Sequence, residues 1–269
     1  MTTGLFEGIA RIRARGEPAA LATVIATHGS TPGRSAMKML IRQDGTTAGT
    51  VGGGSMEEEV RRIGLDVMTA EVCRRASFEL SPEAVDDSEL ICGGTVEVFV
   101  EPLTIPTVVL LGAGHLATAI APVAAVAGFR VIVGDDRDSH ASAARFPQAD
   151  EVLAQPFDEL LAGLAPRLGA ASYCVIVTRS HRLDEQCAAA CLRSDARYVG
   201  MIGSRKKVAR CHEFLRQQGL ADDVIARLAA PVGLELGAQT HGEIAVAIVA
   251  ELVAVRRGAT GGLAPAKGR

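Results

Sequence analysis

The stretch VVLLGAGHLATAIAPVAAVAGFRVIVGDD, residues 108–136, decides the fold. It opens with a continuous apolar run, which is typical of a strand buried on both faces of a parallel sheet. The pattern Gly112-x-Gly114-x-x-Ala117 follows. An alanine-rich segment of helical length then leads to a second apolar run, which ends at Asp135. Strand, glycine turn, helix, strand and acidic residue in this order predict a β-α-β unit that binds a dinucleotide.

Each residue of this pattern has a mechanical role. Gly112 permits the tight turn, Gly114 lets a pyrophosphate approach the backbone, and Ala117 lets the helix pack closely on the strand. We expect Asp135 to accept a hydrogen bond from a ribose hydroxyl and to repel a 2′-phosphate, which favours NAD over NADP. The alternative is a domain of the same fold that binds nothing and keeps its glycines for packing. The pattern leaves the base of the nucleotide open.

Apolar and amphipathic runs continue to alternate along the chain. The runs that predict strands are RVIVGDD, DEVLA, SYCVIVT and RYVGMIG, and those that predict helices are HLATAIAPVAAVAG, FDELLAGL, RLDEQCAAACLRS, RKKVARCHEFLRQQG and GEIAVAIVAELVAVRRG. This alternation with short connections is typical of an α/β protein with a doubly wound parallel sheet. We therefore expect a Rossmann-like domain over residues 105–269, with a disordered tail over 258–269.

Residues 1–104 have a different texture, with short β-like runs separated by turns. LATVIATHG and TVEVFVEPL predict single strands, and KMLIRQDGTTAGTVGG predicts two strands joined at Asp44-Gly45, a favourable hairpin pair. SMEEEVRRIGLDVMTAEV has apolar residues near helical spacing, and Ser55 marks its expected start. The stiff connector PLTIP follows. The first half is therefore expected to form a small α+β domain.

Three glycine clusters stand at strand ends or turns of this first half. Their candidate binding residues are Gly29, Ser30, Gly52, Gly53, Gly54, Gly93 and Gly94. Exposed backbone amides beside a helix N-terminus form a concavity that binds anions. Glu57 is expected instead to hydrogen-bond an amide-rich heterocycle. Cys92, directly before two glycines, is a reactive cysteine, and so a candidate catalytic residue, or a contact for a metal or cofactor, or a buried residue. Tight turns without a ligand are the alternative for all three clusters.

Two loops of the second half should open onto the same crevice as the glycine pattern, because the carboxyl ends of parallel strands share one edge. In VTRSHRLDE, His181 is a candidate catalytic acid or base oriented by Asp184, or else Asp184 caps the following helix. In GMIGSRKK, Ser204 and Arg205 begin a helix, where cations oppose the helix dipole. A bound phosphate would relieve that opposition.

Composition bounds the function. The chain of 269 residues is 48% hydrophobic and 22% charged, with a net charge of −3, as in ordinary globular proteins. Such a charge favours neither a nucleic acid nor an anionic membrane, and 3% aromatic residues without tryptophan provide few stacking platforms. The opening residues have no apolar core of signal-peptide length, so we expect a cytoplasmic protein. The six cysteines lack C-x-x-C spacing, so reduced thiols and no metal site are expected.

The order of the motifs resembles the XdhC/CoxI family, which comprises accessory proteins for the maturation of molybdenum hydroxylases such as xanthine dehydrogenase. The resemblance covers roughly residues 20–258. The motifs that carry it are GSTPGRSAMKM, DGTTAGTVGGGSMEEEV, CGGTVEVFVEPL, LLGAGHLATAIAPVAAVAGFRVIVGDDR, RSHRLDE, YVGMIGSRKK and PVGLELGAQTHGEIAVAIVAELVAVRRG.

The resemblance implies a protein that binds the molybdenum cofactor, supports its sulfuration by a cysteine desulfurase and delivers it to the apo-hydroxylase. The pterin or its phosphate is then expected near Gly29, Ser30, Gly52, Gly53, Gly54, Glu57, Cys92, Gly93 and Gly94. A nucleotide, or the dinucleotide part of the cofactor, is expected at Gly112, Gly114, His115, Asp135 and Arg137. A homodimer is a further expectation, because a labile cofactor needs more covering wall than one small chain supplies.

Two other functions stay open. An NAD-dependent oxidoreductase would use the glycine pattern for its cofactor and His181 or Cys92 as the reactive group. A regulatory scaffold would bind only protein, and small molecules would not stabilise it.

Overall fold

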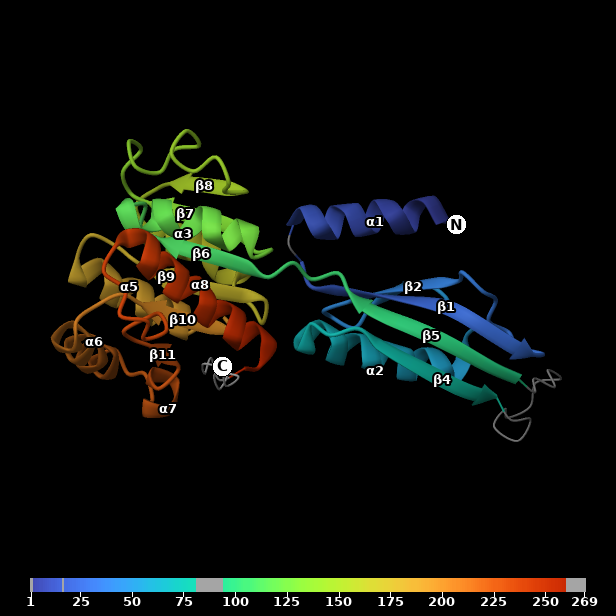
Figure 1. Cartoon of the computed structure of the whole chain (residues 1–269). Helices are drawn as coiled ribbons and strands as arrows, with labels where there is room; N and C mark the ends of the chain where they lie inside the picture. Colours follow the sequence, from blue (N-terminus) through green and yellow to red (C-terminus); the bar gives the residue numbers. More distant parts are fainter. Residues whose placement is uncertain (1, 16, 81–93, 260–269) are drawn as a thin grey trace, which may run out of the picture. The chain divides into compact units, whose positions relative to one another are not determined.

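The computed structural model describes residues 2–15, 17–80 and 94–259. The chain divides into two compact units, Met1–Ile105 and Pro106–Arg269 (Figure 1). The division falls one residue after the boundary expected between residues 104 and 105. The expected tail lies mostly outside the described residues, after the last helix ends with Gly258 in a left-handed conformation.

The first unit is an antiparallel sheet with a helix on each face. Its strand order is β3-β2-β1-β5-β4. The strands are β1 Ala19–Gly29, β2 Lys38–Arg42, β3 Thr47–Gly49, β4 Arg74–Leu80 and β5 Gly94–Pro102, and the helices are α1 Thr2–Arg15 and α2 Gly54–Ala70. Val60, Val67 and other apolar residues of α2 pack against Val98 and its strand neighbours. Leu5 of α1 packs against Leu40 from the opposite face.

Local sequence signals explain most of this unit. The hairpin turns where Asp44-Gly45 predicts it, and the Asp44 carboxylate accepts a 2.9 Å hydrogen bond from the Thr46 N–H. Helix α2 begins one residue before the expected Ser55, with Gly53 as its N-cap. Helix α1 and strand β4 were not predicted. The strand RRASFEL carries charged residues, so its apolar content is low, and pairing with β5 decides its conformation.

The second unit is a parallel sheet between two helical layers, as the alternating pattern predicts. Its strand order is β11-β10-β9-β6-β7-β8. The strands are β6 Thr107–Leu111, β7 Arg130–Asp135, β8 Glu151–Ala154, β9 Ser172–Ile176, β10 Tyr198–Met201 and β11 Leu228–Ala229. All five strand pairings are parallel. The doubly wound, Rossmann-like fold is therefore confirmed.

The helices of this unit cover the two faces of the sheet. They are α3 His115–Val126, α4 Phe157–Leu164, α5 His181–Leu192, α6 Arg205–Gln217, α7 Asp222–Ile225 and α8 His241–Arg257, with a short 3-10 helix, η2, at Ala165–Arg167. Ile120 of α3 and Ile248 of α8 belong to the apolar core on one face. Leu160 of α4, Leu192 of α5 and Leu215 of α6 belong to the core on the other. In the described ranges, no helix is long and apolar enough to cross a membrane.

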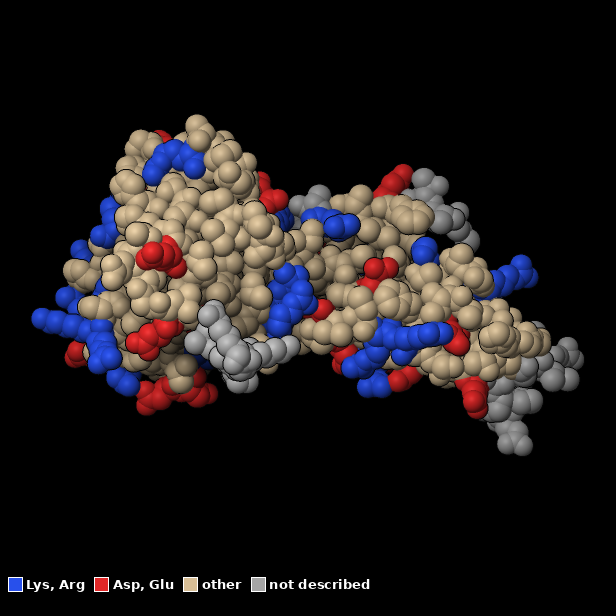
Figure 2. All heavy atoms as spheres, viewed as in Figure 1, with Lys and Arg blue, Asp and Glu red and all other residues tan. Residues whose placement is uncertain are grey.

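Strand order reverses between β6 and β9, which is where ligands bind in open α/β sheets. The glycine loop after β6 lies at this point. Gly112 has φ +111°, and a Cβ there would lie 2.5 Å from the carbonyl oxygen of Val177, so the turn accepts no other residue. Charged side chains of both signs are scattered over the face of the molecule seen in Figure 2, whereas α3 itself carries none.

Candidate functional site

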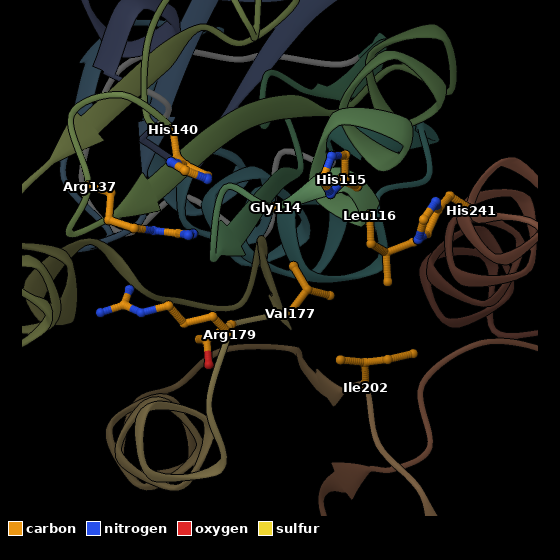
Figure 3. A pocket seen from close by; sticks show the side chains of 10 residues that line it. Gly114, His115, Leu116, Arg137, His140, Val177, Arg179, Ile202 and His241 are labelled. Carbon is orange, nitrogen blue, oxygen red and sulfur yellow. The ribbon is translucent and has the colours of Figure 1, made fainter.

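A pocket of about 390 Å³ opens beside the glycine loop of the second unit (Figure 3). It is lined by Gly114, His115, Leu116, Arg137, His140, Val177, Thr178, Arg179, Ile202 and His241. Residues from loops after β6, β7, β9 and β10 therefore meet at one edge of the sheet, as expected for this fold. A Cβ built on Gly114 would find no atom within 4 Å, so the backbone there has room for a ligand.

The N-terminus of α3 faces this pocket without a capping side chain. Its N-cap is Gly114, and no acidic residue stands in its first turn. By contrast, side chains of Ser180, Ser204 and Thr240 cap α5, α6 and α8. The first amides of a helix carry partial positive charge and need acceptors. An anion in the pocket would supply such acceptors for α3.

Two histidines from distant parts of the sequence meet at the pocket. The rings of His115 and His241 stack with their centroids 6.1 Å apart and an interplanar angle of 18°. Each is the first residue of its helix, and α3 and α8 pack together in one layer. His140 lines the pocket as well, and in Figure 3 it lies with Arg137 and Arg179 at the opposite end of the view from the histidine pair.

Asp135, expected to contact a ribose, is engaged within the chain. Its side chain is 1% exposed. One oxygen accepts hydrogen bonds from the Ala113 N–H at 2.7 Å and from Arg137 Nη2 at 2.8 Å, and the other accepts from Arg137 Nε at 2.7 Å. Burial acts to raise the pKa of Asp135, but the hydrogen bonds from Arg137 and Ala113 outweigh it and lower that pKa to about 2. Asp135 thus holds the glycine loop to β7.

A second ion pair lies beside the first. Arg179 donates two hydrogen bonds to the Asp136 carboxylate. Arg145 donates a 3.1 Å hydrogen bond to the carbonyl oxygen of Ala113, so side chains hold the loop through both its N–H and its C=O. Within the described part of the chain, the residues that line the pocket include two arginines and three histidines and no carboxylate.

The proposed pairing of His181 with Asp184 is not found, and neither is the proposed cap. Asp184 is 1% exposed, accepts hydrogen bonds from the N–H and Oγ1 of Thr178, and forms an ion pair with Lys207. Ser180 caps α5 in its place. His181 is exposed at the helix start. The ion pair with the buried Asp184 also explains why a cation, Lys207, stands in the first turn of α6.

Ser204 and Arg205 stand at the start of α6. Ser204 is the N-cap and accepts a 3.4 Å hydrogen bond from the Lys207 N–H, and Arg205 is exposed. Neither residue lines the pocket, although Ile202 of the same loop does. Arg179 of VTRSHRLDE lines the pocket, as expected for that loop, whereas His140 and His241 are pocket residues that the sequence reasoning missed. A signal was present for His241, because THGE begins a helix with a capping box.

In the first unit, the triple-glycine loop is closed by Glu57. Its Oε1 accepts hydrogen bonds from the Gly53 N–H at 3.0 Å, the Val51 N–H at 3.1 Å and the Thr50 hydroxyl. Partial burial acts to raise the pKa of Glu57, but these hydrogen bonds outweigh it and hold the pKa below its ordinary value. The carboxylate thus takes the place that an external anion would occupy.

Close backbone approach explains other glycines of this unit. Gly29 pairs with Gly94 across β1 and β5, and a Cβ on Gly94 would collide with the carbonyl oxygen of His28. Gly52 has φ +138°, and a Cβ there would lie 2.8 Å from the Gly33 nitrogen. Gly54 is exposed, as is Ser30 after β1. Cys92 and Gly93 lie outside the described residues.

Comparison with known proteins places this geometry in a family. Residues 108–252 match the model of the XdhC Rossmann domain, and residues 12–79 match that of the XdhC and CoxI family. The chain belongs to the XdhC and CoxI family. Both the resemblance read from the motifs and the Rossmann-like second half are thereby confirmed.

Two curated proteins are similar in sequence to this chain, and they carry different names. Uncharacterized protein YqeB of Escherichia coli K12 is 33% identical over 261 residues, which are 96% of this chain and 47% of that protein. A Bacillus subtilis protein named as a probable xanthine dehydrogenase subunit is 29% identical over 154 residues, 56% of this chain and 43% of that protein. This XdhC and CoxI family chain thus spans less than half the length of both curated relatives.

A solved structure shares the fold. A crystal structure described as a xanthine dehydrogenase from Bacillus halodurans matches 94% of this chain and 95% of its own, with a TM-score of 0.50 and 21% identity. At that identity the match concerns the fold of the XdhC and CoxI family chain and not its chemistry.

Proposed function

We propose that this chain is an accessory protein for a molybdenum hydroxylase of the xanthine dehydrogenase kind. In this role it binds the molybdenum cofactor, protects it during sulfuration and delivers it to the apo-enzyme. Membership of the XdhC and CoxI family supports the proposal, as does the name of the Bacillus subtilis relative. The apo-hydroxylase and a cysteine desulfurase are the proposed partners, and a homodimer is the proposed assembly.

The pocket beside Gly114 is the observation that carries this proposal. The molybdenum cofactor is a pterin with a terminal phosphate, and its dinucleotide form has a pyrophosphate. A pocket of about 390 Å³ with two arginines, three histidines and the uncapped end of α3 suits such a group. When bound, the cofactor supplies the molybdenum and its sulfur ligand. The chain would hold the phosphate through Arg137, Arg179 and the amides that follow Gly114.

A sulfur-handling role for Cys92 is a separate part of the proposal. In the sequence Cys92 directly precedes two glycines, which have no side chains that could shield a neighbouring thiol. Incubation of the loaded chain with a cysteine desulfurase and labelled cysteine should place label on the wild-type protein or its cofactor. A Cys92→Ser variant that carries as much label as the wild type would remove Cys92 from the proposal.

Cofactor retention tests the main proposal. The purified chain is mixed with released molybdenum cofactor, and molybdenum and pterin that co-elute with protein are measured. We expect a His140→Ala/His241→Ala variant to retain about tenfold less, because two pocket side chains are lost. Arg182→Ala removes an exposed cation of α5 that does not line the pocket, and it should retain as much as the wild type. Equal retention by both variants would exclude this pocket.

A nicotinamide dinucleotide remains a second candidate ligand, since the glycine loop has the required form. An NAD-dependent oxidoreductase would bind NADH and transfer hydride to a carbonyl compound. Titration of the chain with NADH, followed by its fluorescence, separates this function from the accessory role. Tight binding together with turnover would favour the oxidoreductase.

A further inference from the structure

We propose that the pocket of the second unit selects its ligand by a terminal phosphate group, and that Asp135 does not bind a ribose. This inference rests on the proposed function for its ligand class and narrows it. A phosphate monoester attached to a flat, mainly uncharged ring is the chemistry that fits. NAD, the ligand that the glycine pattern alone favours, has no terminal phosphate group.

The first step concerns the acidic residue of the pattern. In a dinucleotide site this residue accepts hydrogen bonds from the ribose hydroxyls. Here Asp135 is 1% exposed, and its two oxygens accept four hydrogen bonds, from Ala113 and from the backbone and side chain of Arg137. A ribose could bind Asp135 only by displacing Arg137, which would leave a buried carboxylate with fewer partners.

The second step concerns the neighbouring acceptors. Asp136 is bound by both terminal nitrogens of Arg179, so it is engaged as well. The hydroxyl of Thr178 donates to Asp184 and lies next to that buried carboxylate. Among the described residues that line the pocket, none is an aspartate or a glutamate. The pocket therefore lacks a side chain suited to accept two hydroxyl protons from a diol.

The third step concerns the donors. Arg137 uses Nε and Nη2 on Asp135, and Arg179 uses Nη1 and Nη2 on Asp136. Each guanidinium has five N–H groups, so each keeps donors for another acceptor. Their side chains are 30% and 43% exposed. A terminal phosphate has three acceptor oxygens and close to two negative charges at neutral pH, so it matches these donors and the amides of α3 better than a diol does.

The apolar part of the lining fixes the rest of the ligand class. Leu116, Val177 and Ile202 contribute apolar side chains to the lining, and in Figure 3 Val177 lies between the two groups of polar residues while Leu116 lies beside His241. The stacked pair of His115 and His241 adds flat surface. An aromatic heterocycle would lie against these side chains while its phosphate reaches the arginines.

A set of nucleotide probes tests the inference by isothermal titration calorimetry on the whole chain. The probes are AMP, 2′,3′-dideoxy-AMP, adenosine, inorganic phosphate and pyrophosphate. We expect AMP and dideoxy-AMP to bind within about threefold of each other, and adenosine to bind at least about thirtyfold more weakly, since charge-assisted hydrogen bonds are lost with the phosphate. If dideoxy-AMP binds at least about tenfold more weakly than AMP, or adenosine binds as well as AMP, the inference is overturned. Failure of every phosphorylated probe to bind at about 10 mM also overturns it.

A pair of variants locates the binding and separates the inference from the proposed function. Gly114→Ala places a methyl group where the pocket is open, so AMP affinity should fall at least about tenfold, whereas Arg182→Ala should leave it unchanged. Unchanged AMP affinity in Gly114→Ala would place the binding elsewhere and overturn the inference. Cofactor retention is measured on the same proteins. If the chain retains the cofactor but binds adenosine as well as AMP, only the inference is overturned. If the chain prefers AMP to adenosine but retains no cofactor, only the proposed accessory function is overturned.

Discussion

The Glu57 carboxylate accepts a 3.0 Å hydrogen bond from the backbone N–H of Gly53, the N-cap of the helix that carries Glu57. Asp135 does the same for Ala113 in the glycine loop of the second unit. In both units, a carboxylate of the chain itself accepts hydrogen bonds from backbone amides of a glycine-rich turn. The conformations of these two loops are therefore stabilised by side chains of the protein itself, and neither loop needs a free anion to keep its conformation.

Removing the charge of Glu57 should destabilise the first unit. Glu57→Gln keeps the shape but weakens the hydrogen bonds from Thr50, Val51 and Gly53, and we expect a loss of about 1–2 kcal/mol in unfolding free energy. Glu58→Gln is the matched control, because Glu58 is exposed and its carboxylate pairs with Arg61 on the helix surface. Scanning calorimetry checks both. An equal effect of the two substitutions would contradict the role of Glu57.

Stability should fall in acid as Asp135 takes up a proton. The pKa of Asp135 is lowered from 3.8 to about 2 in the folded chain, so its stabilisation is fully present above about pH 4 and is lost as the pH falls toward 2. The contribution is about 2 kcal/mol. Urea unfolding between pH 5 and 2 should show a shallower decline for Asp135→Asn than for wild type. Asp138→Asn, at an exposed neighbouring site, should follow the wild-type curve.

Two glycines of one loop should respond differently to alanine. Gly112→Ala meets the Val177 carbonyl oxygen at 2.5 Å in a backbone conformation that disfavours side chains, so it should cost at least about 3 kcal/mol of stability. Gly114 has φ −76° and open space around it, so Gly114→Ala should change stability by less than about 1 kcal/mol. Thermal unfolding measures both. A stable Gly112→Ala protein would contradict the described turn.

Thiol reactivity should separate the cysteines. Cys73 is exposed, whereas Cys174, Cys187, Cys191 and Cys211 are buried. Burial raises the pKa of Cys211 to about 11, and a hydrogen bond to Cys191 with burial raises that of Cys174. In a Cys92→Ser protein, Ellman's reagent should therefore titrate one thiol quickly under native conditions and the other four only after unfolding. Rapid reaction of two or more thiols would contradict the described burial.

Local sequence was sufficient for much of the fold. The run around Gly112 and Gly114 fixed a strand, a turn and a helix, because only glycine tolerates the conformation of Gly112 and continuous apolar strands belong in parallel sheets. Asp44-Gly45 fixed the hairpin for a similar reason. Helix α1 and strand β4 were not predicted from the sequence, because packing and pairing with the sheet stabilise them more than the local propensities of their residues do.

The use of the polar residues was decided by tertiary structure. Sequence spacing predicted that Asp135 binds a ribose and that His181 pairs with Asp184. In the folded chain, Asp135 instead accepts hydrogen bonds from Ala113 and Arg137. Asp184 accepts a hydrogen bond from Thr178 and forms an ion pair with Lys207. Sequence alone thus determined the family, the α/β architecture and the glycine turn, since these depend on backbone conformation and periodic burial. Only the fold could bring His241 to His115 and choose a partner for each carboxylate, because hydrogen bonds and ion pairs depend on distances between residues far apart along the chain.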